Sequence, residues 1–167
     1  DGTTAIVAAT THGHAGVVQA LLAAGATPLD PETQQMLEFI GAASSGDEAE
    51  VRRRLADGAD PNAADNRGRT TLFHAAKNGH ADVCRMLLQG GANLEATTKK
   101  GFTAVIIAAL KGHADCVEAL LKGGANPEAT TDKGSTALLK AAENGHADCV
   151  EALLKRGANA NAAAKKG

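Results

Sequence analysis

The chain has 167 residues and a formal net charge of −2, and its only Phe, Tyr or Trp residues are three phenylalanines. This charge balance disfavours a general nucleic-acid binder, because such proteins carry a large basic surplus. No apolar run is long enough to span a membrane, and residues 1–9 lack the basic start of a signal peptide.

Glycine recurs every 33 residues in three separate series. Two series are complete: Gly13, Gly46, Gly79, Gly112, Gly145, and Gly25, Gly58, Gly91, Gly124, Gly157. The third is Gly2, Gly68, Gly101, Gly134, Gly167, with Gln35 in the remaining slot. A fixed period of this length predicts one supersecondary unit that is repeated and stacked. We therefore expect one domain over 1–167, with repeats at about 1–33, 34–66, 67–99, 100–132 and 133–165, and an extended docking surface instead of an enzyme pocket.

The second helix of the second unit is predicted to be polar where the other units are apolar. Two positions, four residues apart, hold Val17 and Leu21, Val83 and Leu87, Cys116 and Leu120, and Cys149 and Leu153 in the other units. The second unit has Glu50 and Arg54 there, an acid-first pair that suits a solvent-facing helix. Because stacked repeats need terminal units with a polar outer face, this unit is predicted to be a starting cap.

A whole unit nevertheless precedes this predicted cap, and the fifth unit keeps an apolar face. Lys166-Gly167 also occupies the same position within the 33-residue period as Asp1-Gly2. One interpretation is a circular permutation, engineered or not, in which the first unit covers the fifth unit of another molecule. The tether of residues 27–35 is too short for the first unit to reach the fifth unit of its own chain. The other is an ordinary stack, in which the first unit packs on the second and Arg54 extends outward.

Residues 101–130 show the anatomy expected of one unit. Gly101 can adopt a positive φ at a tight turn, and Thr103 is a predicted N-cap. An apolar helix is predicted at 104–110 and an amphipathic helix at 114–122, each followed by glycine. Neither helix could persist alone at this length, so stability must come mainly from contacts between units.

These motifs resemble the ankyrin repeat. The family's Gly-His pair is matched by Gly13-His14, Gly79-His80, Gly112-His113 and Gly145-His146, with Gly46-Asp47 as a variant. Its Leu-Leu-x-x-Gly-Ala stretch is matched at 21–26, 87–92, 120–125 and 153–158, and its Thr-Pro-Leu-His opening, in degraded form, at 4–7, 70–73, 103–106 and 136–139. The resemblance covers the whole chain. It implies an all-α solenoid of stacked antiparallel helix pairs with β-turn fingers, which binds a protein partner on its concave side.

One departure from the family is systematic. The histidine that helps to hydrogen-bond the turn in the family is replaced in every unit, by Val7, Ile40, Phe73, Ile106 and Leu139. We expect these five residues to form a ladder of apolar side chains that is buried between units, so that packing fixes the turns. If it were exposed, the ladder would be an apolar surface patch prone to association.

The cysteines are predicted to be buried thiols of a reducing compartment, which indicates the cytoplasm or the nucleus. Cys84, Cys116 and Cys149 all lie in helical, apolar contexts. Cys116 and Cys149 are expected in neighbouring layers, which lie too far apart for a disulfide.

The histidines of the Gly-His pairs fall one per unit, so they cannot converge as metal ligands do, and we expect them to hold turns. They are His14, His80, His113 and His146. The sequence contains no catalytic, phosphate-binding or cofactor-binding motif, so neither an enzyme nor a cofactor is predicted.

The candidate partner-binding residues come from the fingers and first helices of units three to five. They are Arg67, Arg69, Lys77, Lys99, Lys100, Phe102, Leu110, Lys111 and Lys133, called the basic strip below. An exposed aromatic ring surrounded by Arg and Lys is typical of an interface hot spot, and the alternative is an ordinary charged surface. The strip would suit an acidic protein segment, with salt-sensitive binding.

The leading hypothesis is therefore a non-catalytic protein-interaction scaffold. One alternative is a stack that self-assembles or exchanges units through the faces of its first and fifth units. Another is an ankyrin-type inhibitor of an enzyme.

Overall fold

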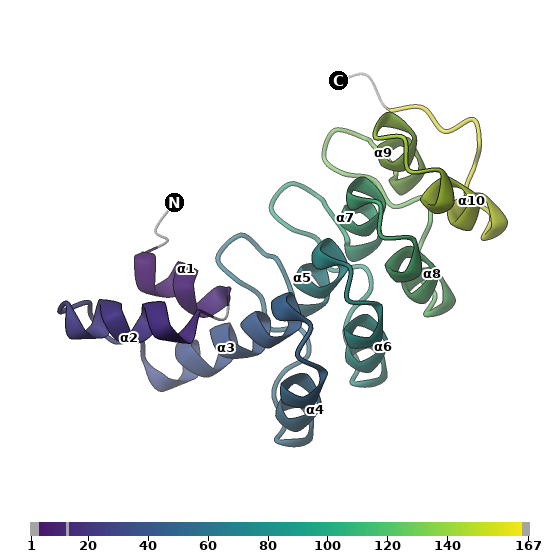
Figure 1. Cartoon of the computed structure of the whole chain (residues 1–167). Helices are drawn as coiled ribbons and strands as arrows, with labels where there is room; N and C mark the ends of the chain where they lie inside the picture. The colour runs from purple at the N-terminus through teal and green to yellow at the C-terminus, as the bar shows by residue number, and fades with distance from the viewer. Residues whose placement is uncertain (1–3, 13, 165–167) are drawn as a thin grey trace.

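The computed structural model describes residues 4–12 and 14–164, and these form an all-α solenoid, as expected. The helices are α1 (Ala5–Thr11), α2 (Ala15–Ala23), α3 (Pro31–Ser45), α4 (Glu48–Ala56), α5 (Thr71–Asn78), α6 (Ala81–Gln89), α7 (Ala104–Lys111), α8 (Ala114–Lys122), α9 (Ala137–Glu143) and α10 (Ala147–Lys155). Each odd-numbered helix packs against the even-numbered helix that follows it, and the pairs stack in chain order (Figure 1).

The stack has two layers. The first helices, α1, α3, α5, α7 and α9, contact one another in series, and so do the second helices α4, α6, α8 and α10. The loops before α5, α7 and α9 project as fingers on the side of the first helices (Figure 1). Two of these fingers are closed by isolated antiparallel bridges, Ala64–Thr70 and Thr130–Thr136.

Local signals in the sequence fix the helix ends. The hydroxyl groups of Thr70, Thr103 and Thr136 each accept a hydrogen bond from the backbone N–H three residues later, at the starts of α5, α7 and α9. Gly79 and Gly112 end α5 and α7 in the left-handed conformation, at φ 85° and 79°. The predicted N-cap at Thr103 is confirmed, and α8 spans the residues expected of it.

The ladder of apolar residues at the family's histidine position is buried in the middle of the stack. Ile40, Phe73 and Ile106 are buried, whereas Val7 and Leu139, in the first and last pairs, are half-buried. The predicted burial is therefore confirmed where a unit has a neighbour on both sides.

A contact between a histidine and a glycine joins the third, fourth and fifth units each to the unit before it. Nε2 of His80, His113 and His146 donates to the carbonyl oxygens of Ser44, Lys77 and Leu110, at 3.1, 3.1 and 3.2 Å. These histidines were expected to hold turns, but their bonds cross from one unit to the preceding one. His14, in the first pair, is exposed, and Gly13 lies outside the described residues.

The glycine in each contact leaves no room for a side chain. A Cβ atom on Gly46, Gly79 or Gly112 would lie 2.5, 2.8 or 2.6 Å from Nδ1 of the histidine of the next unit. Gly145 has the same place in the last pair, and its Cβ would meet nothing within 4 Å. In the second to fifth units the glycine is thus needed for its positive φ, and in the second to fourth also for its small size, because the histidine of the next unit lies against it.

The first pair is joined to the rest differently from the others. Its α1 packs on α3, but α2 does not pack on α4 as the later second helices pack on one another, and Figure 1 shows α2 extending away from α4. Residues 31–35 of the expected tether belong to α3, whose N-cap is Asp30. The first pair thus contacts the second within one chain through α1 and α3, without the packing of second helices that an ordinary stack has. The terminal pairs Asp1-Gly2 and Lys166-Gly167 lie outside the described residues.

We predict that Gly112→Ala destabilises the chain more than Gly145→Ala. Both changes force alanine into a positive φ, which costs about 1 kcal/mol. Only the first pushes a methyl group into a histidine ring, so its loss should be larger by about 1–3 kcal/mol. Urea unfolding of the two variants measures the difference, and equal losses would show that the ring contact is not a constraint.

Candidate protein-interaction surface

Successive fingers lie side by side and hydrogen-bond to each other. The backbone N–H of Lys99 donates to the carbonyl of Arg67 at 3.0 Å, and that of Asp132 to the carbonyl of Lys100 at 3.3 Å. These bonds bring the finger residues of the basic strip from three units onto one continuous edge. Lys99, Lys100 and Lys133 are exposed on it.

The third unit's finger is organised around the buried carboxylate of Asp65. Its Oδ1 accepts from the backbone N–H groups of Arg67 and Arg69 at 2.9 and 3.1 Å. Its Oδ2 accepts from the guanidinium of Arg69 at 2.6 Å and from His74 Nε2 at 3.2 Å. Burial alone would raise the pKa of Asp65, but the hydrogen bonds from His74 and Arg69 outweigh it and hold that pKa well below its usual value.

His74 is a structural residue that the sequence reasoning missed. It follows the family's histidine position by one residue and is buried, and its burial lowers its pKa. The signal was the histidine next to Phe73, together with an aspartate in the preceding turn. Packing is therefore not alone in fixing this turn, because a buried ion pair and hydrogen bonds do so as well.

The fourth and fifth fingers use threonine at the position of Asp65. Thr98 Oγ1 accepts from the backbone N–H groups of Lys100 and Phe102, and Thr131 Oγ1 accepts from that of Ser135. A neutral threonine side chain thus stabilises the same turn. At the position of Asp65, these two fingers therefore have no carboxylate to offset the charge of their lysines.

Cations from two units gather beside the fingers. Burial lowers the pKa of Lys77, at the end of α5, and the charges of Arg69 and Lys111 lower it further. Lys77 therefore lies near enough to Arg69 and Lys111, two other members of the basic strip, for their charges to act on it. The only carboxylate among the groups that influence Lys77 is Asp65, which is already bonded to Arg69 and His74.

Two members of the strip are less accessible than the sequence suggested. Phe102, expected as an exposed ring, is half-buried and packs against the core, and so does Leu110. The carbonyl of Leu110 also accepts the bond from His146. A partner could touch only part of either side chain, so the cations form most of the accessible strip.

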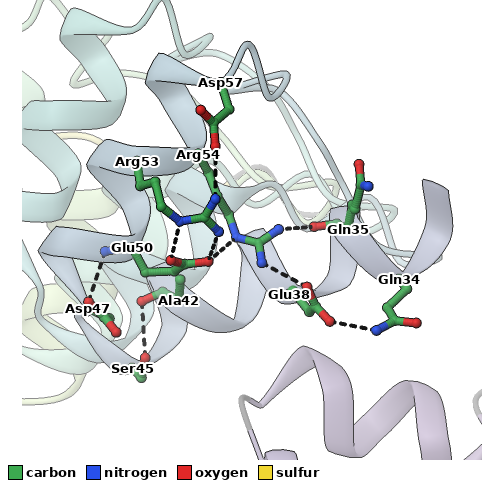
Figure 2. Close-up of polar contacts among 10 residues, drawn as sticks. All are labelled: Gln34, Gln35, Glu38, Ala42, Ser45, Asp47, Glu50, Arg53, Arg54 and Asp57. Atoms are coloured by element: carbon green, nitrogen blue, oxygen red, sulfur yellow. Dashed lines mark hydrogen bonds and ion pairs between the residues drawn. The ribbon is translucent and has the colours of Figure 1, made fainter. Parts of the chain in front are cut away.

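The predicted cap on α4 is a network of ion pairs. Glu50 accepts from Arg54 Nε at 2.6 Å and from Arg53 at 2.6 and 2.9 Å (Figure 2). Arg54 also donates to Glu38 at 2.7 Å and to the carbonyl of Gln35 at 3.0 Å. The expectation that Arg54 extends outward is therefore wrong: it reaches α3 and is largely buried. Hydrogen bonding from Arg53 is the main reason that the pKa of Glu50 falls to about 2.

A cleft separates this network from α2. Its volume is about 300 Å³, and it is lined by Val18 and Gln19 of α2 on one side and by Glu38, Glu50 and Arg54 on the other. The polar face of α4 is thus paired with α3 but is not covered by α2.

The three cysteines are buried and form no disulfide within the described residues. The neighbouring thiol of Cys116, where α6 meets α8, and burial together raise the pKa of Cys84. The sequence reasoning placed Cys116 and Cys149 in register but did not foresee the contact with Cys84.

Family comparison agrees with this geometry. The model described as "Ankyrin repeats (3 copies)" matches residues 39–131 and 90–164, and the one described as "Ankyrin repeat" matches residues 1–32. The chain belongs to the ankyrin repeat family. Ankyrin repeats generally mediate protein–protein interactions, and the family is generally non-catalytic. No curated protein shows significant similarity to the chain.

Over residues 4–12 and 14–164, no three His, Cys, Asp or Glu side chains come together as metal ligands would. No helix in the same residues has the length and apolar character needed to cross a membrane.

We predict that Asp65→Asn lowers the free energy of unfolding at pH 7 by about 1–3 kcal/mol, because it removes the charge from a buried carboxylate that is hydrogen-bonded to Arg69 and His74. Since folding lowers the pKa of Asp65, its stabilisation is present above about pH 4 and is lost as the pH falls further. Chemical unfolding at several pH values should therefore show wild type and variant converging below about pH 4.

Asp148→Asn is the matched control, because Asp148 is an exposed aspartate on α10. It should change stability by less than about 0.5 kcal/mol. A difference between wild type and Asp65→Asn that persists unchanged in acid would contradict the role given to the carboxylate.

Proposed function

We propose that this chain is a non-catalytic interaction scaffold that binds an acidic segment of a partner protein along the basic strip. The observation that carries this proposal is the line of exposed lysines on hydrogen-bonded fingers, with Lys77 beside them under the charges of Arg69 and Lys111. Holding like charges close together costs free energy in the unbound protein, and an anionic ligand relieves that cost. Electrostatic complementarity of this kind also steers the encounter and makes it depend on salt.

The arrangement of the fingers supports an extended ligand. The bonds from Lys99 to Arg67 and from Asp132 to Lys100 keep neighbouring finger tips in register. A segment lying along this edge could pass the cations of three units in turn. A compact ligand would meet only one or two of them.

Phe102 supports the proposal less than a fully exposed ring would, because only part of it is available to a partner. Its ring packs partly against the core, so a partner's apolar residue could cover only the remainder. Phe102→Ala would therefore also remove core packing, and charge variants give the cleaner test.

The test uses a labelled oligoglutamate peptide as a defined probe, with fluorescence anisotropy at increasing salt. Lys77→Glu combined with Lys111→Glu should weaken binding at least about tenfold at low salt. The wild-type affinity should fall steadily as salt rises, because exposed charges are screened.

The matched control is Arg52→Glu combined with Lys155→Glu. It makes the same change in net charge at exposed residues of α4 and α10, away from the fingers. Equal weakening by the two double variants would mean that net charge alone attracts the peptide, and would refute the strip as a site.

A further inference from the structure

In the third unit, one finger residue and two helix residues form a patch beside the finger. Oδ2 of Asp65 joins Arg69 of the finger to His74 of α5, since it accepts from Arg69 at 2.6 Å and from His74 at 3.2 Å. Lys77 follows His74 by three residues and so lies on the same face of α5. The patch of the third unit therefore contains Arg69, His74 and Lys77, and it is cationic.

The fourth unit has apolar side chains at the three equivalent positions, 33 residues later. They are Phe102, Ile107 and Leu110. Ile107 is buried, whereas Phe102 and Leu110 are half-buried and pack against the core. The patch of the fourth unit is thus apolar, with a buried floor and two partly exposed sides.

The fifth unit has polar side chains at the same positions, Ser135, Lys140 and Glu143. Lys140 Nζ donates to Glu143 Oε2 at 2.8 Å. This ion pair shows that the two helix positions of a patch share one face of the helix, and it leaves the pair without net charge. The surface therefore changes from cationic in the third unit to apolar in the fourth and to charge-balanced in the fifth.

The spacing of the patches fits an extended peptide segment. Helix α5 packs on α7, and α7 packs on α9 (Figure 1), and helices packed in this way lie about 8–10 Å apart. A polyproline II segment rises about 3.1 Å per residue with three residues per turn, so side chains three residues apart lie on one face, about 9 Å apart. Two such side chains can therefore meet two neighbouring patches.

We propose that the segment bound along the basic strip carries an apolar side chain three residues from an acidic one, with the apolar side chain on Phe102 and Leu110 and the acidic one beside Lys77. This inference rests on the proposed function and adds to it a specificity set by the fourth unit. Only parts of Phe102 and Leu110 are exposed, so one side chain covers what remains. The patch is far smaller than the interface that a folded domain or a second copy of the chain needs.

The acidic residue is expected on the side of the third unit and not of the fifth. Lys140 is already paired with Glu143, whose carboxylate would also repel an acidic side chain. Asp65, the carboxylate that acts on Lys77, is engaged by two other side chains, so it offsets the charge of Lys77 less than a direct ion pair would. An anionic group therefore gains more beside Lys77 than beside Lys140.

Fluorescence anisotropy of the full chain with three labelled peptides tests this inference. Each peptide begins with the same run of glutamates, which is followed by Pro-Pro-Leu, by Pro-Pro-Ser or by Leu-Pro-Pro. The leucine is thus three residues from the last glutamate, absent, or next to it, and the prolines favour the polyproline II conformation. The Pro-Pro-Leu peptide should bind at least about fivefold tighter than the Pro-Pro-Ser peptide, and the peptide with adjacent leucine should gain less than about twofold. Peptides of the reversed sequences are measured as well, since the patches accept either chain direction, and the gain is expected in at least one direction.

Leu110→Lys tests the same contact from the side of the protein. Its equivalent in the third unit is Lys77, so a lysine already occurs at this position of the repeat. The variant should bind the glutamate run more tightly and lose the gain from leucine, because the apolar patch is replaced by a cation. Gln89→Lys is the matched control, with the same charge change at an exposed residue of α6, and it should keep the full gain.

Equal binding of the leucine and serine peptides in both directions would overturn the inference, and that comparison needs only the wild-type chain. A gain that survives Leu110→Lys would also overturn it, because the leucine would then bind elsewhere. In either case the proposed function would stand if oligoglutamate still bound and were weakened by Lys77→Glu with Lys111→Glu. Failure of every acidic peptide to bind would instead refute the proposed function, and this inference with it.

Discussion

The contact of each histidine with the glycine of the preceding unit is the constraint on which the stack depends. His80, His113 and His146 each place an imidazole where a Cβ on that glycine would stand, and each donates to a carbonyl of the preceding unit. The contact fixes the distance and rotation between units, so the apolar residues of one helix pair meet those of the next. Short helices of this kind would not persist without that coverage.

The stack is regular only from its second pair onward. Glu50 and Arg54 replace the apolar side chains that would receive α2, and their bonds to Arg53 and Glu38 occupy them fully. As a result α2 contains no buried residue, while α4 buries Val51 against the units that follow. One polar pair therefore separates the regular array, which holds the fingers of the basic strip, from a first pair whose α2 buries no residue.

The sequence predicted the repeating parts of the fold well, because each of them depends on local rules. The period located the helix pairs, threonine marked the starts of α5, α7 and α9, and glycine marked the ends of α5 and α7. The burial of Ile40, Phe73 and Ile106 followed from their equivalent positions. These features recur in several units, so those units support the interpretation of one another.

The parts that were missed depend on long side chains or on contacts between distant residues. A guanidinium can reach outward or across to a neighbouring helix, and the sequence alone did not show that Arg54 would find Glu38. His74, in α5, pairs with Asp65, which lies nine residues earlier in the sequence, in the finger. For the candidate site, the identity of the cations was predictable, but the partial burial of Phe102 and Leu110 was not, since it depends on how the fingers pack.

Native-state hydrogen exchange, followed helix by helix on dilute protein, tests the central claim most directly. If neighbouring units supply most of the stability, amides of α6, α7 and α8 should exchange slowest, because both sides of these helices are covered. Amides of α2 should exchange fastest among the helices, because nothing in α2 is buried. Protection of α2 equal to that of α8 would contradict the account, since it would show that a helix in this chain is stable without the coverage of its neighbours.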